Sequence, residues 1–191
     1  LQPTLYGTPM MPTLDILEVN AFSTLMLFKS FQQYICDPAL RIEELPIPES
    51  VKQVIITSGI TELYPPQEEA IRAGALEEKN LVLASPTASG KTLIAELCAL
   101  KHVLERDGKV LYLTPLRALA SEKYEEFKEY TAIRKKNGKR INVGISTGDY
   151  DSSDPWLEKF DIIITTNEKA DSLLRHRARW VNEISLVIAD E

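Results

Sequence analysis

The sequence has few cysteines and histidines, and this scarcity argues against two classes of site. Cys36 and Cys98 lie far apart in the chain, so we expect them to be packing residues in a reducing compartment rather than a disulfide. His102 and His176 have no cysteine or histidine partner at the spacing of metal ligands. We therefore expect no zinc site.

Long apolar runs and an excess of positive charge are also missing. No apolar stretch is long enough to span a bilayer. The short apolar segment 21–28 lacks a basic leader and a small-residue cleavage pattern, so we expect no membrane partner and a cytoplasmic location. The net charge of the 191 residues is −6, which does not favour wholesale coating of nucleic acid but leaves local phosphate contacts open.

What the sequence does contain is a regular alternation of apolar runs and helical patterns. Between these runs, apolar residues recur at helical spacing, as in the face formed by Leu93, Leu97, Leu100 and Leu104. Such an alternation predicts an α/β fold with a parallel sheet of at least five strands and helices on both faces. The predicted strands are 81–84, 110–114, 141–145, 162–165 and 186–189.

The first part of the chain follows a different pattern. Three prolines interrupt its start, and Asn20 can cap a helix that carries apolar residues up to Tyr34. We expect residues 1–40 to form a helical or extended arm of unknown role. Residues 41–191 are expected to form a single nucleotide-binding domain, truncated at its end.

A phosphate-binding loop follows the first predicted strand. The run from Ser85 to Thr92 places small residues and Gly-Lys-Thr between a strand and a helix, where backbone N–H groups favour an anion. Lys91 would reach the outer phosphates and the Thr92 hydroxyl would hold Mg²⁺. Ser85 stands where the P-loop motif has its first glycine. A chance Gly-Lys-Thr in a strand-to-helix turn is the alternative.

Two acidic residues follow the last predicted strand. Asp190 can hold Mg²⁺ opposite a P-loop, and Glu191 beside it can accept a proton from an attacking water. The alternative is that these acids merely end a strand. The carboxyl ends of parallel strands meet at one edge of the sheet, so we expect this pair to lie near Lys91.

Taken together, these motifs resemble the first motor domain of superfamily II helicases, in the Ski-type group. The chain is most similar to the archaeal DNA-repair helicases of the Hel/Hjm kind, in which a serine- or proline-containing loop replaces the glycine-first P-loop. The resemblance covers about residues 41–191 and implies a P-loop domain of the RecA-like fold. Six motifs carry it: Tyr64-Pro65-Pro66-Gln67, 84–92, Thr114-Pro115-Leu116-Arg117-Ala118-Leu119-Ala120, 146–151, Thr166-Asn167-Glu168-Lys169 and Ala189-Asp190-Glu191.

The resemblance implies roles for individual residues. Lys91 and Glu191 would be catalytic, with Glu191 as the base, and Thr92 and Asp190 would hold Mg²⁺. The residues expected to bind ATP are Gln67, which would face the adenine, and Ser85, Pro86, Thr87, Ala88, Ser89, Gly90, Lys91 and Thr92. Those expected to contact single-stranded nucleic acid, chiefly its phosphates, are Pro115, Arg117, Ala118, Thr147, Gly148, Thr166 and Glu168.

The implied function is that of an ATP-dependent DNA helicase or translocase that acts on branched or tailed DNA in repair and recombination. The second motor domain of that family is absent from the sequence given, so we expect this chain, as a monomer, to hydrolyse ATP slowly or not at all. Three alternatives stay open. They are an RNA helicase of the same group, a P-loop kinase or simple NTPase, and a binding module without turnover that uses residues 1–40.

Two basic clusters each allow two interpretations. The cations of residues 134–140 flank the predicted Asn137-Gly138 turn, and they form either a solvated loop or a nucleic-acid contact. The cations of residues 175–179 precede Trp180. They suit either strand binding, with Trp180 stacking on a base, or a helix C-terminus with Trp180 in the core.

Overall fold

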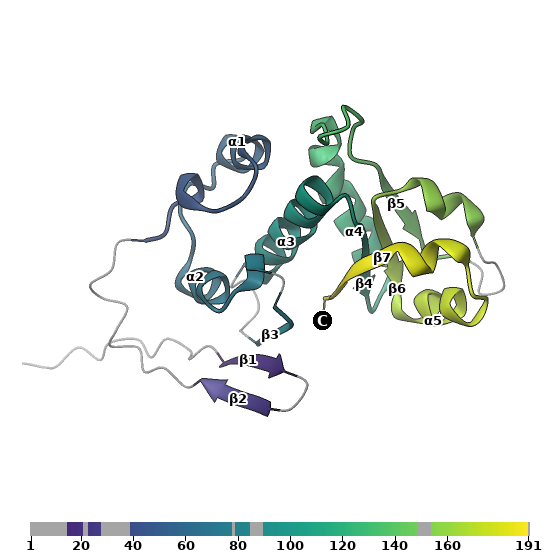
Figure 1. The fold of residues 1–191 in the computed structure, drawn as a ribbon, viewed down its shortest axis with the longest axis horizontal. Coiled ribbons are helices and arrows are strands. Elements are labelled where there is room, and N and C mark those ends of the chain that lie inside the picture. Colours follow the sequence, from purple (N-terminus) through teal and green to yellow (C-terminus); the bar gives the residue numbers. More distant parts are fainter. Residues whose placement is uncertain are drawn as a thin grey trace, which may run out of the picture.

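The computed structural model describes residues 39–77, 79–84, 90–148 and 154–190, together with the backbone of two strands near the start of the chain. Most of these residues belong to a layered α/β domain (Figure 1). No helix among them has both the length and the apolar character needed to cross a membrane.

A parallel sheet of four strands forms the centre of the domain. Its strand order is β5-β6-β4-β7, and every neighbouring pair is parallel. The sequence forms this sheet because its apolar runs are rich in isoleucine, leucine and valine, which suit strands covered on both faces. The strands are β4 (Lys109–Thr114), β5 (Val143–Ser146), β6 (Ile162–Thr166) and β7 (Ile184–Ala189).

Helices cover both faces of this sheet, as predicted. Val110 and Tyr112 of β4 face a large core built with α3 (Lys91–Arg106) and α4 (Arg117–Lys128). Leu111 faces the opposite side, where Leu173 of α5 (Asn167–Arg175) and Trp180 complete a smaller core. The alternation along β4 therefore anchors helices on both sides (Figure 1).

Helix α3 contributes the face that its sequence pattern predicts. Leu97 and Leu100 are fully buried, and Leu93 and Leu104 are nearly so. Each such leucine contributes roughly 1.5–3 kcal/mol through the apolar surface it removes from water. Cys98 lies on the same helix, packs against this core and donates a hydrogen bond to the backbone oxygen of Ala75 at 3.2 Å, so it is a packing residue as expected.

Shorter elements cover the far side of α3. They are η2 (Ile42–Glu44), α1 (Glu49–Thr57), α2 (Pro65–Arg72) and η3 (Ala75–Glu77). Helix α1 begins at Glu49, with Pro48 in the N-cap position. Gly59 follows the C-cap residue Ser58, and its φ of 96° lies in the left-handed region that glycine tolerates.

The prediction of five parallel strands in one sheet is wrong. Strand β3 (Leu81–Ala84) pairs antiparallel with β1 (Asp15–Asn20), in a second sheet of order β2-β1-β3. Its residues alternate between half-buried and exposed, and Val82 is 46% exposed. An apolar run identifies a strand but not the edge with which it pairs, and this strand has one solvent-facing side.

The predicted N-terminal helix is also wrong where the structure describes it. Residues Ser23–Leu27 form strand β2, which pairs antiparallel with β1. A short apolar run does not distinguish helix from strand by periodicity, and here the extended alternative holds. The remaining residues of the predicted helix lie outside the described part of the chain.

Candidate nucleotide and nucleic-acid site

The site residues gather at the carboxyl edge, which is the edge where β4–β7 end. The register pairs Thr114 of β4 with Thr166 of β6, and Leu113 of β4 with Ala189 of β7, so these three strands end at nearly one level. The predicted residues that end or follow the four strands therefore come together. They are Pro115, Arg117, Ala118, Thr147, Gly148, Thr166, Glu168 and Asp190.

Exposure divides the predicted nucleic-acid contacts into two groups. Arg117, Ala118, Gly148 and Glu168 are exposed, and Pro115 and Thr147 are half-buried, so all six can meet a ligand. Thr166 is only 5% exposed. Its hydroxyl accepts a hydrogen bond from the backbone N–H of Lys169 at 3.4 Å and caps α5. In this structure Thr166 therefore serves mainly to start the helix that presents Glu168.

The N-terminus of α3 points toward the same edge. Helix α3 ends at Arg106, and only Asp107 and Gly108 separate it from the start of β4. Its C-terminus therefore lies where β4 begins, and the helix runs back along the sheet toward the end where β4 stops. At 1.5 Å per residue its 16 residues span about 24 Å, which matches the roughly 20 Å length of β4. This topology brings the start of α3 to the carboxyl-edge end of the domain (Figure 1). Gly90, Lys91 and Thr92 lie at that start.

Gln67 and Gly90 are in direct contact. The Gln67 side-chain nitrogen donates to the backbone oxygen of Gly90 at 3.0 Å, while its oxygen accepts from the N–H of Tyr64 at 2.8 Å. A Cβ on Gly90 would overlap the Gln67 amide, and the Gly90 φ of 77° is left-handed, so this position requires glycine. The glutamine predicted to face the adenine is thus hydrogen-bonded to the glycine in the N-cap position of α3.

Asp190 is held by a residue that the sequence patterns did not single out. The Tyr112 hydroxyl donates to Oδ2 of Asp190 at 2.7 Å, and the Asp190 N–H bonds to the backbone oxygen of Leu113 at 3.0 Å. Burial, followed by the Asp190 carboxylate, raises the pKa of Tyr112 well above its usual range. The hydroxyl therefore stays protonated and fixes one oxygen of Asp190. Tyr112 is missed because its position inside an apolar run marks it only as a core residue.

A second tyrosine–carboxylate pair is buried in the domain, and it is formed by Tyr130 and Glu96. Tyr130 donates to Oε2 of Glu96 at 2.8 Å, between η4 (Glu129–Ala132) and α3. Burial is the largest influence on Glu96 and raises its pKa from 4.5 to about 7. The hydrogen bond from Tyr130 opposes that rise, and the nearby Glu126 carboxylate adds to it.

A buried ion pair supports the loops at the carboxyl edge. Nζ of Lys169 lies 3.0 Å from Oδ2 of Asp154, and the Lys169 side chain is 1% exposed. The same Asp154 oxygen accepts a hydrogen bond from the Ser146 hydroxyl at 2.6 Å. The pair therefore ties the end of β5 to the first turn of α5. The motif 166–169 contains Lys169, but nothing in the sequence indicates Asp154 as its partner.

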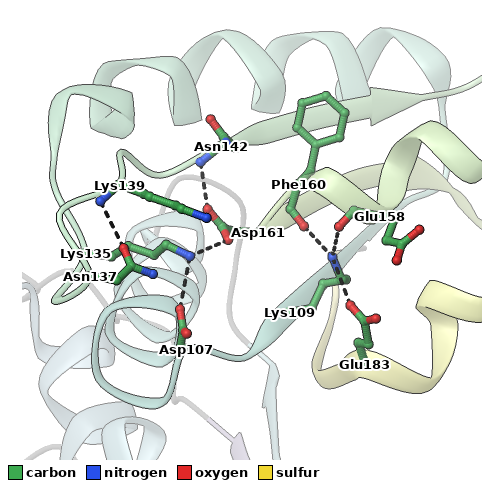
Figure 2. Close-up of polar contacts among 10 residues, drawn as sticks. All are labelled: Asp107, Lys109, Lys135, Asn137, Lys139, Asn142, Glu158, Phe160, Asp161 and Glu183. Carbon is green, nitrogen blue, oxygen red and sulfur yellow. Dashed lines mark hydrogen bonds and ion pairs between the residues drawn. The ribbon is translucent and has the colours of Figure 1, made fainter.

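The structure separates the two basic clusters from the site. Trp180 is 2% exposed and packs with Leu111 and Ile163, so its interpretation as a core residue is confirmed and base stacking by it is wrong. In the other cluster, Nζ of Lys135 forms ion pairs with Asp107 at 3.0 Å and Asp161 at 2.8 Å (Figure 2). Both clusters precede strands, so they belong to the opposite, amino edge of the sheet.

Several predicted site residues lie outside the described part of the chain. They are Ser85, Pro86, Thr87, Ala88 and Ser89 of the P-loop, and Glu191. Their assigned roles stay predictions, as do the roles assigned to the residues that the structure does describe.

Comparison with known families matches residues 64–191 to the DEAD/DEAH box helicase domain. The curated relatives include proteins described as ATP-dependent DNA helicase Hel308. The one from Thermococcus kodakarensis is 54% identical over 152 residues, and the one from Methanocella arvoryzae is 53% identical over 153 residues. Each match covers 80% of this chain but 13% and 20% of those proteins, respectively. The chain thus spans a fifth or less of their length.

Solved structures give a related result. The crystal structure of the DUF1998 helicase MrfA matches with a TM-score of 0.61 at 28% identity, and covers 76% of this chain and 24% of that one. MrfA bound to DNA and AMPPNP matches with a TM-score of 0.57, also at 28% identity, over 76% of this chain and 21% of that one. The likeness therefore extends to a helicase captured with both a nucleic acid and a nucleotide analogue.

Proposed function

The chain belongs to the DEAD/DEAH box helicase family, as its motifs predicted, and on that premise we propose that it is the ATP-binding motor domain of an ATP-dependent DNA helicase. The observation that carries the proposal is the common placement at the carboxyl edge of the start of α3, with Lys91, and of Asp190. The names of the relatives favour DNA over RNA, and tailed or branched DNA in repair is the substrate class we propose.

The residues fit a magnesium nucleotide. A threonine hydroxyl and a carboxylate are hard oxygen ligands, and Mg²⁺ typically takes one or two protein ligands together with phosphates and water. We propose that Thr92 and Asp190 hold the ion, which neutralises phosphate charge when it is bound. Tyr112 keeps one Asp190 oxygen in a fixed direction through its 2.7 Å hydrogen bond.

The remaining groups would orient the substrate and move one proton. Lys91 would contact the outer phosphates, and Gln67 would meet the adenine while it holds Gly90 in place. Glu191 would accept the proton of the water that attacks the terminal phosphorus, and the bond to the leaving phosphate oxygen would break. Arg117 and Thr147 would contact the phosphates of single-stranded DNA, which positions the strand without reading its sequence.

The isolated chain should bind nucleotide but turn it over slowly. In this reaction class a separately supplied arginine can be worth about 10³-fold or more in rate, and we propose that a second motor domain supplies it in a longer, monomeric protein in the cytoplasm. An ATPase assay with and without single-stranded DNA tests this. Brisk turnover by the isolated chain that DNA stimulates would contradict the proposal.

Nucleotide binding by a Lys91→Ala variant tests the site itself. A charged hydrogen bond contributes about 1.5–3 kcal/mol, so titration with a fluorescent ATP analogue should show affinity reduced about 10- to 100-fold. Lys101→Ala is the matched control, because Lys101 lies on the same helix but pairs with Glu105 at 3.0 Å. Equal affinities of the two variants would refute the assignment of Lys91.

A further inference from the structure

The basic segment 134–140 is an ordered hairpin rather than an irregular loop. Arg134 and Arg140 form an antiparallel bridge, and the Gly138 N–H donates to the backbone oxygen of Lys135 at 2.9 Å. The side chain of Asn137 accepts from the Lys139 N–H at 2.9 Å, and Gly138 adopts a φ of 79°. These bonds define a tight turn, so the backbone positions that carry the cations of this basic hairpin are fixed.

The basic hairpin is fastened to the amino edge of the sheet. Ile133 and Ile141 at its base are 5% and 1% exposed. Lys135 turns inward and bridges Asp107, which follows α3, and Asp161, which precedes β6 (Figure 2). Lys135 therefore anchors the hairpin, and Nζ of Lys136 also donates to the backbone oxygen of Glu105 at 3.5 Å. The side chains of Arg134, Lys136, Lys139 and Arg140 are all exposed.

A cavity of about 510 Å³ lies between this hairpin, the C-terminus of α3 and the start of α1. Three cations line it, namely Arg106, Arg134 and Lys136. Glu105 is the acidic residue of the lining, and its carboxylate is paired with Lys101 at 3.0 Å. The cavity therefore carries a net positive charge in a chain whose overall charge is −6.

The chemistry of the lining favours phosphate over peptide. Protein interfaces concentrate aromatic side chains and methionine at their centres, whereas Pro48 and Leu104 are the apolar side chains of this lining. Clustered arginine and lysine side chains without an aromatic surface are typical of contacts to a nucleic-acid backbone, which are independent of sequence.

We propose that this cavity and the basic hairpin form a second DNA-contact surface, which binds backbone phosphates at the amino edge of the sheet. The identification of the bound polyanion as DNA rests on the proposed function. The surface itself is a contact beyond those that the proposed function assigns. Strand β4 spans about 20 Å, so this surface and the carboxyl edge are separated by roughly six base pairs of duplex at 3.4 Å each. A tailed duplex of about 20 base pairs can therefore reach both.

The test measures binding of a fluorescent tailed duplex to this chain, without nucleotide, at several salt concentrations. Lys136→Glu should weaken binding at least about fivefold, while the matched reversal Lys79→Glu, an exposed cation outside the cavity, should change it less than about twofold. The double variant Arg134→Gln and Lys136→Gln should lower the slope of log affinity against log salt by about 2. Circular dichroism of each variant confirms that it is folded.

The pattern of results distinguishes failure of this inference from failure of the proposed function. Unchanged affinity and salt slope in the hairpin variants, with binding reduced by Arg117→Ala, would overturn the inference and leave the proposed function standing. A chain that binds no DNA would overturn both. If poly-glutamate binding depends on Lys136 while DNA binding does not, the surface recognises an acidic protein and the phosphate assignment is wrong.

Discussion

Exposed charged side chains begin two helices at the carboxyl edge of the central sheet, whereas two lysines at its amino edge are paired with the loops around them. At the carboxyl edge, Arg117 and Glu168 stand exposed at the starts of helices. At the amino edge, Nζ of Lys109 donates to the backbone oxygens of Glu158 and Phe160, each at 2.7 Å, and lies 3.5 Å from Glu183 (Figure 2). Lys135 is similarly engaged. Charge that stabilises the fold is paired internally, whereas charge left at the surface is available to a ligand.

The buried ion pair of Lys169 and Asp154 is an exception to this contrast at the carboxyl edge, and we expect the largest effect from breaking it. We expect Asp154→Ala to lower the free energy of unfolding by about 3–5 kcal/mol, because it leaves the Lys169 ammonium buried without its carboxylate. Urea denaturation measures the change. Arg175→Ala, which breaks the exposed pair with Asp171, is the control and should cost less than about 1 kcal/mol. Similar losses in the two variants would show that the buried pair does not support this edge.

A second prediction concerns how stability depends on pH. The pKa of Glu96 is raised from 4.5 to about 7 in the folded chain, so the folded state binds its proton more tightly than the unfolded state. Stability from this group is present below pH 4.5 and is lost as pH rises to about 7, by on the order of 2–3 kcal/mol. Glu96→Gln should therefore lose less stability than the parent chain between pH 5 and 8. Parallel stability curves would contradict this.

The smallest expected effect is the one most specific to the site. Tyr112→Phe removes only the hydroxyl that orients Asp190, so affinity for magnesium nucleotide should fall by about three- to tenfold, the equivalent of one hydrogen bond of about 1 kcal/mol. Titration with and without Mg²⁺ measures this. The loss should disappear when Mg²⁺ is omitted, whereas a purely structural effect would persist. Tyr130→Phe, which leaves Asp190 untouched, is the matched control.

Much of the fold could be predicted from the sequence because its signals are local. The leucines of α3 repeat at helical spacing, and the threonine cap of α5 lies next to the helix that it starts. The pairing of β3 could not be predicted, because strand partners are chosen between distant segments. Its edge pairs with β1, more than 60 residues earlier in the chain.

The candidate site could be predicted from the sequence to a similar extent, because its motifs are local but its contacts are not. Strand ends and the Gly-Lys-Thr motif indicate which residues meet at the carboxyl edge, since parallel strands end together. The contacts that hold those residues join distant parts of the chain, such as Tyr112 with Asp190 and Gln67 with Gly90. Local motifs single out Asp190, Gln67 and Gly90, but they indicate neither Tyr112 nor which residue contacts which. Only the folded chain shows that Gln67 is committed to Gly90.

Strand β7 has a further consequence for handling the protein. Among the strands that the structure describes, β7 pairs on one side only, with β4, and Val187 is 55% exposed. A free strand edge with an exposed valine is a template onto which another copy can add by backbone hydrogen bonding. Concentrated solutions of the protein are therefore expected to form larger assemblies on storage. Dilution should slow their formation.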